Sequence, residues 1–561
     1  MHHLNLITRR GFLDRSMKLG LGVALSTLVD VPLVLKRALA EGNIGVPGPN
    51  GATKKLLFIF LRGANDGLNA LIPVRDDAYN STNRPDLYIP EDGAAGIYDA
   101  TTGVADFPAS SSNSAATDFN TFWYGNSIAL RNGFAALHPS LKFLAPVHNA
   151  GDLVLAHRVG YPKQSRSHFD SQRYWENGTP NNNVLQEGIF YRALVESGLA
   201  RTAPLTGVSI QSALPLLLRG SAAAMTNLND PTRYELLGVP NTAAGKFKAL
   251  GGIQTATPYP FPAKLSRELL NLQYENLSQT LQIFDGITGF DETGNLFEDD
   301  TPTDGDVGPY YLFPTAAAKN GGGRYHTALN GQGQPAPDPN KFVVDDTNPA
   351  YAFFRNLKAA ALVLNNTDAI IAGTEVTGWD THNNQGGVTG THASLLRRVG
   401  WAMYALRKYF SVYGRGNNAP SADRKVNWDD VVVVTLSEFG RTTIQNANNG
   451  TDHAEAGTMF VAGGAVRGGV YGCHPNDQYN GHALPWITGQ IGSMFGVNDR
   501  YLKRVIDYRS VLGELIRDHL GATPSQLGRI IPGYADAGEH LLGGGTSSLD
   551  GTPIAGELGI V

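Results

Sequence analysis

Four short runs of apolar and β-branched residues alternate with polar turn segments along the chain. They are "KKLLFIFL" (54–61), "DLVLAHRVG" (152–160), "DAIIAGTEV" (368–376) and "VVVVTLS" (431–437). Runs of this length without a polar face are typical of buried parallel strands. Residues 393–410 and 508–520 have instead the apolar spacing of helices. Because the two patterns alternate, we expect an α/β fold in which helices sandwich a mostly parallel central sheet.

Two stretches interrupt this alternation and predict insertions. Residues 90–130 are rich in Ala, Ser, Thr and Gly. Residues 205–350 combine a helical pattern at 263–284 with a long loop rich in Gly, Asp and Pro. Within that loop, "EDDTPTDGDVG" (298–308) lacks the full pattern of a calcium loop, which favours a solvated segment. We therefore expect one domain over residues 41–561, with loop-rich insertions at about 90–130 and 205–350.

The first 40 residues have the layout of a twin-arginine export signal. Arg9 and Arg10 precede an apolar stretch at 19–35, and "ALA" (38–40) provides a small-residue cleavage site. An ordinary N-terminal helix is the alternative. Asp30 and Pro32 argue against a permanent membrane span. The signal predicts a partner, the twin-arginine translocation machinery, and a periplasmic or secreted location for the mature protein.

The composition narrows the function classes. The chain has 561 residues, of which 42% are hydrophobic and 17% charged, as in folded soluble proteins. A net charge of -5 with no long basic run gives no reason to expect nucleic acid as a partner. Cys473 is the only cysteine, so the chain forms no internal disulfide. Twin-arginine substrates fold before export, which suits a protein that loads a metal ion in the cytoplasm.

Candidate metal ligands follow three of the predicted strands. They are Asp66 after the first strand, Asp380 and His382 after 368–376, and Glu438, Asp452 and His453 after 431–437. In open α/β sheets, ligands bind beyond the carboxyl ends of the strands, so we expect these side chains to converge. Carboxylates with imidazoles suit a divalent ion such as zinc, manganese, magnesium or calcium. The sequence therefore predicts a metal cofactor, with its identity and count left open.

Each candidate also has a structural interpretation. Asp66 could be a helix N-cap, Asp380 could form an Asx turn, and His382 could be a hydrogen-bonded loop residue. Glu438 could pair with Arg441. Several carboxylates in one crevice would repel one another unless cations or protons neutralised them, and this favours the metal interpretation.

A candidate nucleophile lies in "KQSRSHFDSQRYWENG" (163–178), where a loop enters a predicted helix. The hydroxyl groups of Ser165 and Ser167 would face the positive end of the helix dipole, and Arg166 could bind two oxygens of a phosphate or sulfate. Alternatively, Ser167 and Asp170 form an S-x-x-D capping pattern. No G-x-S-x-G motif surrounds the serines, which disfavours an α/β-hydrolase.

Several motifs together resemble an exported bacterial family, domain of unknown function 1501. They are "FLRGANDGLNALIP", "SRSHFDSQRYWENG", "GWDTHNNQ", "SEFGRT" followed by "GTDH", and "DYRSVLGELIRDHLG", in that order between about residues 54 and 535. This family is similar to the alkaline phosphatase and sulfatase superfamily. The resemblance implies metal ligands at Asp66, Asp380, His382 and His453, and a nucleophile at Ser167 with Ser165 in reserve. Glu438 would stand where relatives carry an Asp-His pair, and Asp452 would bind the ion or orient His453.

The chain departs from that family at the late histidines. Phe439 follows Glu438 where the enzymes often have histidine, and "GTDHAEAG" (450–457) stands where "GTDHGHG" is usual, with Glu455 nearby. These departures imply an altered or absent second metal site. The resemblance predicts an exported metal-dependent hydrolase of small phosphate or sulfate esters that uses a serine nucleophile. The alternative is a non-catalytic, metal-stabilised binding or assembly protein of the cell envelope.

Overall fold

The computed structural model describes most of the chain between residues 53 and 561. The described residues are 44, 53–91, 127–130, 132–200, 205–231, 313, 349–411, 426–484, 486, 500–535 and 538–561. The predicted export signal, the helical pattern at 263–284 and most of both predicted insertions lie outside these residues. The domain boundaries therefore stay predictions.

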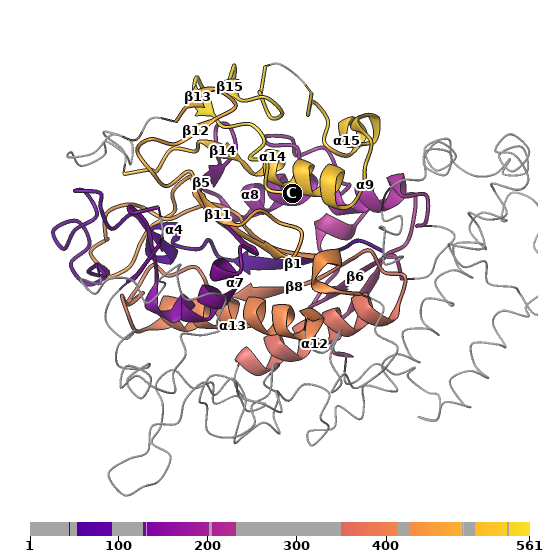
Figure 1. Ribbon diagram of the computed structural model, residues 1–561, viewed down its shortest axis with the longest axis horizontal. Helices are drawn as coiled ribbons and strands as arrows, with labels where there is room; N and C mark the ends of the chain where they lie inside the picture. The colour runs from indigo at the N-terminus through magenta and orange to yellow at the C-terminus, as the bar shows by residue number, and fades with distance from the viewer. Residues whose placement is uncertain are drawn as a thin grey trace, which may run out of the picture.

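A nine-stranded sheet runs through the described residues (Figure 1). Its spatial order is β11-β5-β10-β9-β1-β8-β6-β7, and β14 pairs with β5. The strands are β1 (Lys55–Arg62), β5 (Leu153–Gly160), β6 (Gly207–Ile210), β7 (Thr226–Leu228), β8 (Ile371–Thr377), β9 (Val431–Ser437), β10 (Gly457–Gly463), β11 (Gly469–Tyr471) and β14 (Ile506–Asp507). The four predicted strands are β1, β5, β8 and β9, which confirms them to within three residues at each end.

The sheet is parallel except at β10. Leu57 of β1 lies opposite Ala372 of β8 and Val433 of β9 in parallel register. β10 runs antiparallel to both of its neighbours, β9 and β5. As a result, β10 begins at the edge where the other strands end. Segments that precede β10 therefore meet segments that follow β1, β5, β8 and β9.

Short strands add smaller sheets around this core. β2 (Leu71–Ile72), β4 (Ala136–Leu137) and β3 (Ile128–Ala129) form one; β12 (Gln478–Tyr479) pairs with β13 (His482–Ala483), and β15 (Gly545–Thr546) with β16 (Pro553–Ile554). β6 and β7 lie within the stretch that the sequence assigns to an insertion, yet they extend the central sheet beside β8. The apolar pattern misses both because each has only three or four residues.

Helices cover both faces of the sheet (Figure 1). On one face lie α7 (Ala145–Asn149), α12 (Pro349–Asn366) and α13 (Thr391–Ser411), and on the other α8 (His168–Asn177), α9 (Ile189–Glu196), α14 (Tyr508–Glu514) and α15 (Pro524–Ile530). A short helix α4 (Gly67–Ala70) follows β1, and a π-helical segment, Leu515–His519, continues α14. The predicted helices at 393–410 and 508–520 correspond to α13 and to α14 with that segment.

Alternate residues of β1 enter two hydrophobic cores. Leu57, Ile59 and Leu61 pack in the core that contains α12 and α13, whereas Phe58 and Phe60 pack in the core with α8, α9 and α14. Each such side chain contributes about 1.5–3 kcal/mol when it is fully buried. Burial on both faces explains why β1 has no polar alternation, and the α/β prediction is confirmed.

Among the described residues, no helix is both long enough and apolar enough to span a membrane.

Candidate functional site

The topology gathers polar side chains from four segments at one edge of the sheet. The chain leaves β5 and enters α8 at His168, and it leaves β8 through Trp379 to Asp380 and His382. Glu438 follows β9 directly. His453 lies four residues before β10, whose antiparallel direction places it at this same edge.

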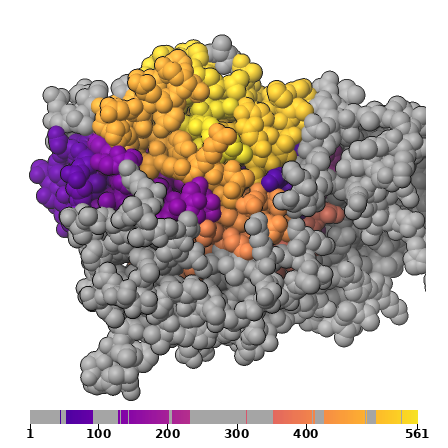
Figure 2. Space-filling view, in the orientation of Figure 1, coloured from indigo at the N-terminus to yellow at the C-terminus, as the bar shows by residue number. Residues whose placement is uncertain are grey.

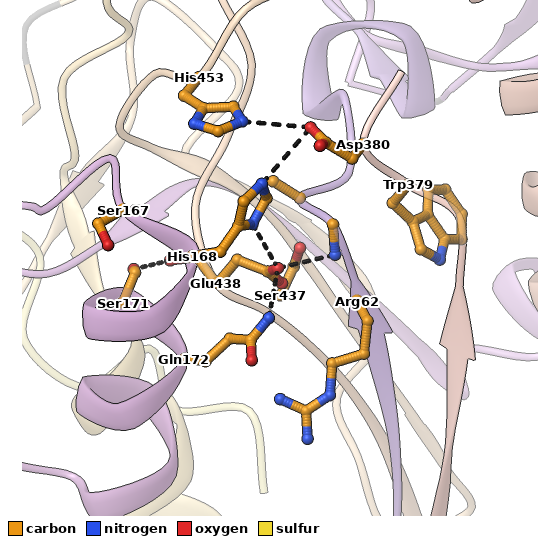
Figure 3. A network of polar contacts seen from close by, with 12 residues as sticks. Arg62, Ser167, His168, Ser171, Gln172, Trp379, Asp380, Ser437, Glu438 and His453 are labelled. Atoms are coloured by element: carbon orange, nitrogen blue, oxygen red, sulfur yellow. Dashed lines mark hydrogen bonds and ion pairs between the residues drawn. The ribbon is translucent and has the colours of Figure 1, made fainter. Parts of the chain in front are cut away.

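Three histidine rings surround one oxygen of Asp380. The Nε2 atoms of His382, His453 and His168 lie 3.0, 3.2 and 3.5 Å from Oδ1 of Asp380. The Nε2 atoms of His382 and His453 are 2.9 Å apart. Ligand atoms of His168, Asp380 and His453 all lie within 4.8 Å of one another. Figure 3 shows His453 and His168 directed from different sides toward Asp380.

The other nitrogen of each ring contacts an acceptor. Nδ1 of His168 lies 3.0 Å from Oε1 of Glu438, and Nδ1 of His382 lies 3.1 Å from Oδ1 of Asp452. Nδ1 of His453 lies 2.9 Å from the carbonyl oxygen of Arg166. Ionised carboxylates and carbonyls only accept hydrogen bonds, so each Nδ1 carries the proton. In the neutral form of each ring the Nε2 lone pair faces the carboxylate of Asp380, and Nη1 of Arg441 lies 3.5 Å from Nε2 of His382.

Bare lone pairs directed at an anion repel it unless a cation or protons lie between them. Nε2 of His168 is buried without a hydrogen-bond partner, as expected of an unused lone pair. The Nε2 atoms of His382 and His453 and Oδ1 of Asp380 lie 2.9 to 3.2 Å apart, close enough for one ion with bonds of about 2.0 Å to contact all three. Histidines whose outer N–H groups contact carboxylates or carbonyls are the usual arrangement around protein-bound metals. The residues present thus fit one divalent ion.

Arg441 supplies a fixed positive charge beside this cluster. Its Nη2 contacts Oδ1 of Asp380, and its side chain also donates to the carbonyl groups of Ala64 and Thr451. Burial alone would raise the pKa of Asp380, but the contact with Arg441 outweighs burial and lowers this pKa to about 2. Asp380 is therefore ionised at neutral pH. The sequence offers Arg441 as a partner of Glu438, whereas the structure pairs it with Asp380.

The acceptor carboxylates are ionised as well. Burial alone raises the pKa of Glu438, but hydrogen bonds from His168 and Gln172 bring it below its usual range. For Asp452, hydrogen bonds from Asn446 and His382 outweigh burial and lower its pKa. The hydrogen bond to Glu438 raises the pKa of His168, because it stabilises the imidazolium form.

The cluster is open to solvent on one side. The side chain of Asp380 is 46% exposed, and those of His382 and His453 are 35% and 26% exposed. Structural zinc sites are closed, whereas catalytic sites keep a position accessible to water or substrate. The exposure of these ligand candidates therefore fits a reactive site better than a structural one.

The structure pairs Asp66 with an arginine. Asp66 is fully buried, and its two oxygens accept hydrogen bonds from Nη1 and Nη2 of Arg84 at 3.0 and 3.1 Å. Gln385 donates a third hydrogen bond, at 2.6 Å, to the same carboxylate. Burial raises and Arg84 lowers the pKa of Asp66, and the net shift is downward. Its charge is thus compensated by an arginine.

The two predicted serines are engaged with backbone groups. The hydroxyl of Ser167 accepts from the backbone N–H of Asp170 at 3.5 Å, and that of Ser165 accepts from the backbone N–H of Ser167 at 3.1 Å. In the described part of the chain, neither is hydrogen-bonded to an imidazole or carboxylate that could take its proton. Figure 3 shows Ser167 at the start of α8, with Asp380 and His453 beyond His168. Arg166 is exposed, and its guanidinium stacks on the ring of Tyr501 at 4.1 Å.

His168 is the residue that sequence reasoning missed. It is the first residue of α8, next to Ser167, and the stretch "SRSHF" draws attention to its hydroxyl groups. A signal was nevertheless present, because His168 lies in the loop-to-helix segment that follows the buried strand β5, just as Asp380 and Glu438 lie in segments that follow β8 and β9. The structure also assigns Glu438 and Asp452 to the outer nitrogens of His168 and His382, so that neither shares the inner set of donor atoms.

Residues 344–486 match the model of a family described as protein of unknown function (DUF1501). The matched segment includes Asp380, His382, Glu438 and His453, but it begins well after His168. No curated protein and no solved structure matches the chain.

Proposed function

We propose that the protein is a metal-dependent hydrolase of phosphate or sulfate esters, with one divalent ion held by His168, Asp380, His382 and His453 and a fifth position on the exposed side left for water or substrate. The observation that carries the proposal is the set of three imidazole Nε2 atoms around one oxygen of Asp380. A divalent ion in such a set lowers the pKa of water and neutralises charge on an oxyanion. Zinc is the ion that this donor set favours, because three imidazoles and one carboxylate suit it well.

The chain's own residues support an anionic substrate. The N-terminus of the ten-residue helix α8 brings a partial positive charge next to His168. Arg166 is exposed at the same loop, and its guanidinium can donate to two oxygens of one phosphate or sulfate. Arg441 compensates the charge of Asp380, so the positive charge of an ion stays available to the substrate.

Water is the nucleophile in this proposal. Ser167 serves as the cap of α8, and among the described residues no imidazole or carboxylate is hydrogen-bonded to its hydroxyl as the base that nucleophilic catalysis needs. Hydrolysis then breaks the ester bond between the phosphorus or sulfur atom and the alcohol oxygen. The water oxygen joins phosphorus or sulfur, and the alcohol leaves with a proton. Attack by water replaces the mechanism that the sequence predicts, in which Ser167 or Ser165 attacks the ester and forms a phospho- or sulfo-serine intermediate.

Two further expectations belong with the proposal. The parallel sheet with ligands at its carboxyl edge is compatible with a likeness to the alkaline phosphatase and sulfatase superfamily, in a version with one ion. Export by the twin-arginine route would place the enzyme in the periplasm or outside the cell, where esters of phosphate and sulfate are accessible to it.

Elemental analysis and ester hydrolysis test the proposal together. We expect about one equivalent of a divalent ion in purified wild-type protein, and its loss in His168→Ala and in the double variant Asp380→Ala, His382→Ala. The ion-loaded protein should hydrolyse p-nitrophenyl phosphate or p-nitrophenyl sulfate, and the variants should not. A folded wild-type protein that binds no zinc, manganese, magnesium or calcium would refute the proposal. Tight ion binding without hydrolysis of any ester would instead favour a metal-stabilised binding protein of the cell envelope.

A further inference from the structure

One buried amide joins the two loops that carry the ligand candidates. Gln385 is fully buried, and its Oε1 accepts hydrogen bonds from the hydroxyls of Thr381 at 2.9 Å and Thr451 at 2.6 Å. Thr381 lies between Asp380 and His382, and Thr451 lies two residues before His453. A single oxygen atom thus connects the loop after β8 with the loop before β10.

The other end of the amide is held by a buried ion pair. Nε2 of Gln385 donates to Oδ2 of Asp66 at 2.6 Å, and Arg84 contacts both oxygens of that carboxylate. Arg84 also donates to the carbonyl oxygens of Thr442 and Thr443, which follow Arg441. In Figure 2 the indigo and violet segments, which include residues 53–91, lie against the orange segments that begin at residue 426.

The direction of these bonds is set by chemistry. An ionised carboxylate only accepts, so the amide nitrogen of Gln385 must face Asp66 and its oxygen must face the two hydroxyls. No other neutral side chain of similar length has an NH2 group that donates to a carboxylate and an oxygen that accepts from two hydroxyls. The three bonds are in the fully buried interior, where a lost partner leaves polar groups that water cannot reach.

The two loops also meet through their backbones. The N–H of Thr451 donates to the carbonyl oxygen of Thr381 at 3.1 Å, and the N–H of Gln385 donates to the carbonyl of Asn449 at 2.9 Å. A Cβ atom added to Gly450 would lie 2.3 Å from the carbonyl oxygen of His382. These contacts keep the loops paired if the amide is lost, but they leave the Gln385 side chain to fix how closely His382 and His453 approach.

We infer that Gln385, held by Asp66 and Arg84, is a positioning residue that keeps the loops of His382 and His453 at the spacing an ion requires. The inference rests on the metal site of the proposed function. It gives Asp66 a different role from the one that the sequence suggests, since its carboxylate orients Gln385 instead of binding the ion. Residues that orient metal ligands typically change metal affinity by 10–100-fold when they are mutated.

Zinc affinity measured by competition with a chromophoric chelator tests the inference. We expect Gln385→Leu and Gln385→Glu to weaken zinc binding by about 10–100-fold, because the first removes the three bonds and the second places a carboxylate against Asp66. The double variant Asp66→Asn, Gln385→Glu restores an amide-to-carboxylate hydrogen bond in the reversed direction, and it should regain a large part of the affinity that Gln385→Glu loses. A merely structural role would lower the free energy of unfolding of these variants and leave the zinc affinity of the folded protein unchanged.

Two further sets of variants keep the test decisive. Thr381→Val and Thr451→Val each remove one hydroxyl with little change in size, and each should weaken zinc binding several-fold even if a Gln385 variant fails to fold. Gln526→Ala removes another fully buried amide, which caps α15 far from the cluster in sequence, and it should leave zinc affinity unchanged. Wild-type affinity in folded Gln385→Leu and in both threonine variants would overturn the inference while leaving the proposed function intact. A wild-type protein without zinc affinity would refute both.

Discussion

The outer hydrogen bonds of the histidines lead to an ordered prediction for two near-isosteric variants. Asp452→Asn and Glu438→Gln each replace the carboxylate that accepts from a histidine Nδ1, at 3.1 Å for His382 and 3.0 Å for His168. In both variants an amide oxygen can still accept the bond, but the negative charge that strengthens the histidine as a donor is lost.

The magnitudes differ because the two carboxylates differ in exposure. Loss of an outer partner weakens metal binding by about 10–100-fold, which corresponds to about 1.4–2.7 kcal/mol. Asp452 has a side chain that is 42% exposed, so solvent screens its charge and we expect a loss of about tenfold. Glu438 is fully buried, so its charge acts at full strength and we expect a loss of about 100-fold.

Zinc titration of the metal-free protein at pH 7, in low and high salt, measures both effects. The loss in Asp452→Asn should shrink at high salt, and that in Glu438→Gln should not. Asp550→Asn is a matched control, because Asp550 pairs with Arg504 and contacts none of the three histidines. The reasoning would be refuted by affinities within twofold of wild type in both variants, or by a larger loss in Asp452→Asn than in Glu438→Gln.

Three other predictions concern the cap, the pH dependence and the C-terminal segment. Ser167→Ala should lower the free energy of unfolding by about 0.5–1 kcal/mol, because the cap of α8 is lost. Ester hydrolysis and ion content should stay as in the wild type. A variant that keeps the ion but no longer hydrolyses esters would restore the serine mechanism. Burial lowers the pKa of His138 and His157 to about 3 and of His392 and His519 to about 4, below the ordinary value near 6.5. Between about pH 6.5 and 4 the unfolded chain therefore binds more protons than the folded chain. The free energy of unfolding should keep its full value above this range and decrease as the pH drops through it, by up to about 1.4 kcal/mol per pH unit for each histidine. Urea denaturation at pH 7 and pH 5 checks this, and equal stability at both would contradict it. Glu514→Ala should lower the free energy of unfolding by more than about 2 kcal/mol, because the backbone N–H groups of residues 558–561 all donate to this buried carboxylate. A urea midpoint close to that of the wild type would show that water replaces the carboxylate.

The strands of the sheet could be predicted where burial on both faces left an uninterrupted apolar run. β9 coincides with "VVVVTLS", β5 begins one residue after its predicted run, and β1 is displaced from its predicted run by one residue. β6 was missed because a run of four residues has no detectable period. The direction of β10, the one antiparallel strand of the described central sheet, was also beyond local patterns, since strand direction depends on the connections that the whole chain makes.

The site could be predicted in part for a similar reason. Asp380, His382 and His453 were found because strand ends share one edge of the sheet. Asp66 follows a strand as well, but no local pattern reveals that Arg84 folds back onto its carboxylate. The capping pattern of Ser167 and Asp170 was visible and described its hydrogen bond correctly. His168 escaped notice because its role depends on Glu438, which lies 270 positions away.

The place of β5 in the sheet has a consequence for the order of folding. Within the part of the chain that the structure describes, β5 pairs with β10, β11 and β14, all of which are synthesised about 300 to 350 residues later. Until β10 has emerged from the ribosome and inserted between β5 and β9, the early strand has no neighbour, and α8 cannot bring His168 to Asp380. Such non-local pairing is slow, because bringing the two ends of a long chain segment together costs conformational entropy before any stabilising contact forms. Ion affinity would therefore be acquired last, and a bound ion would mark chains whose folding is complete.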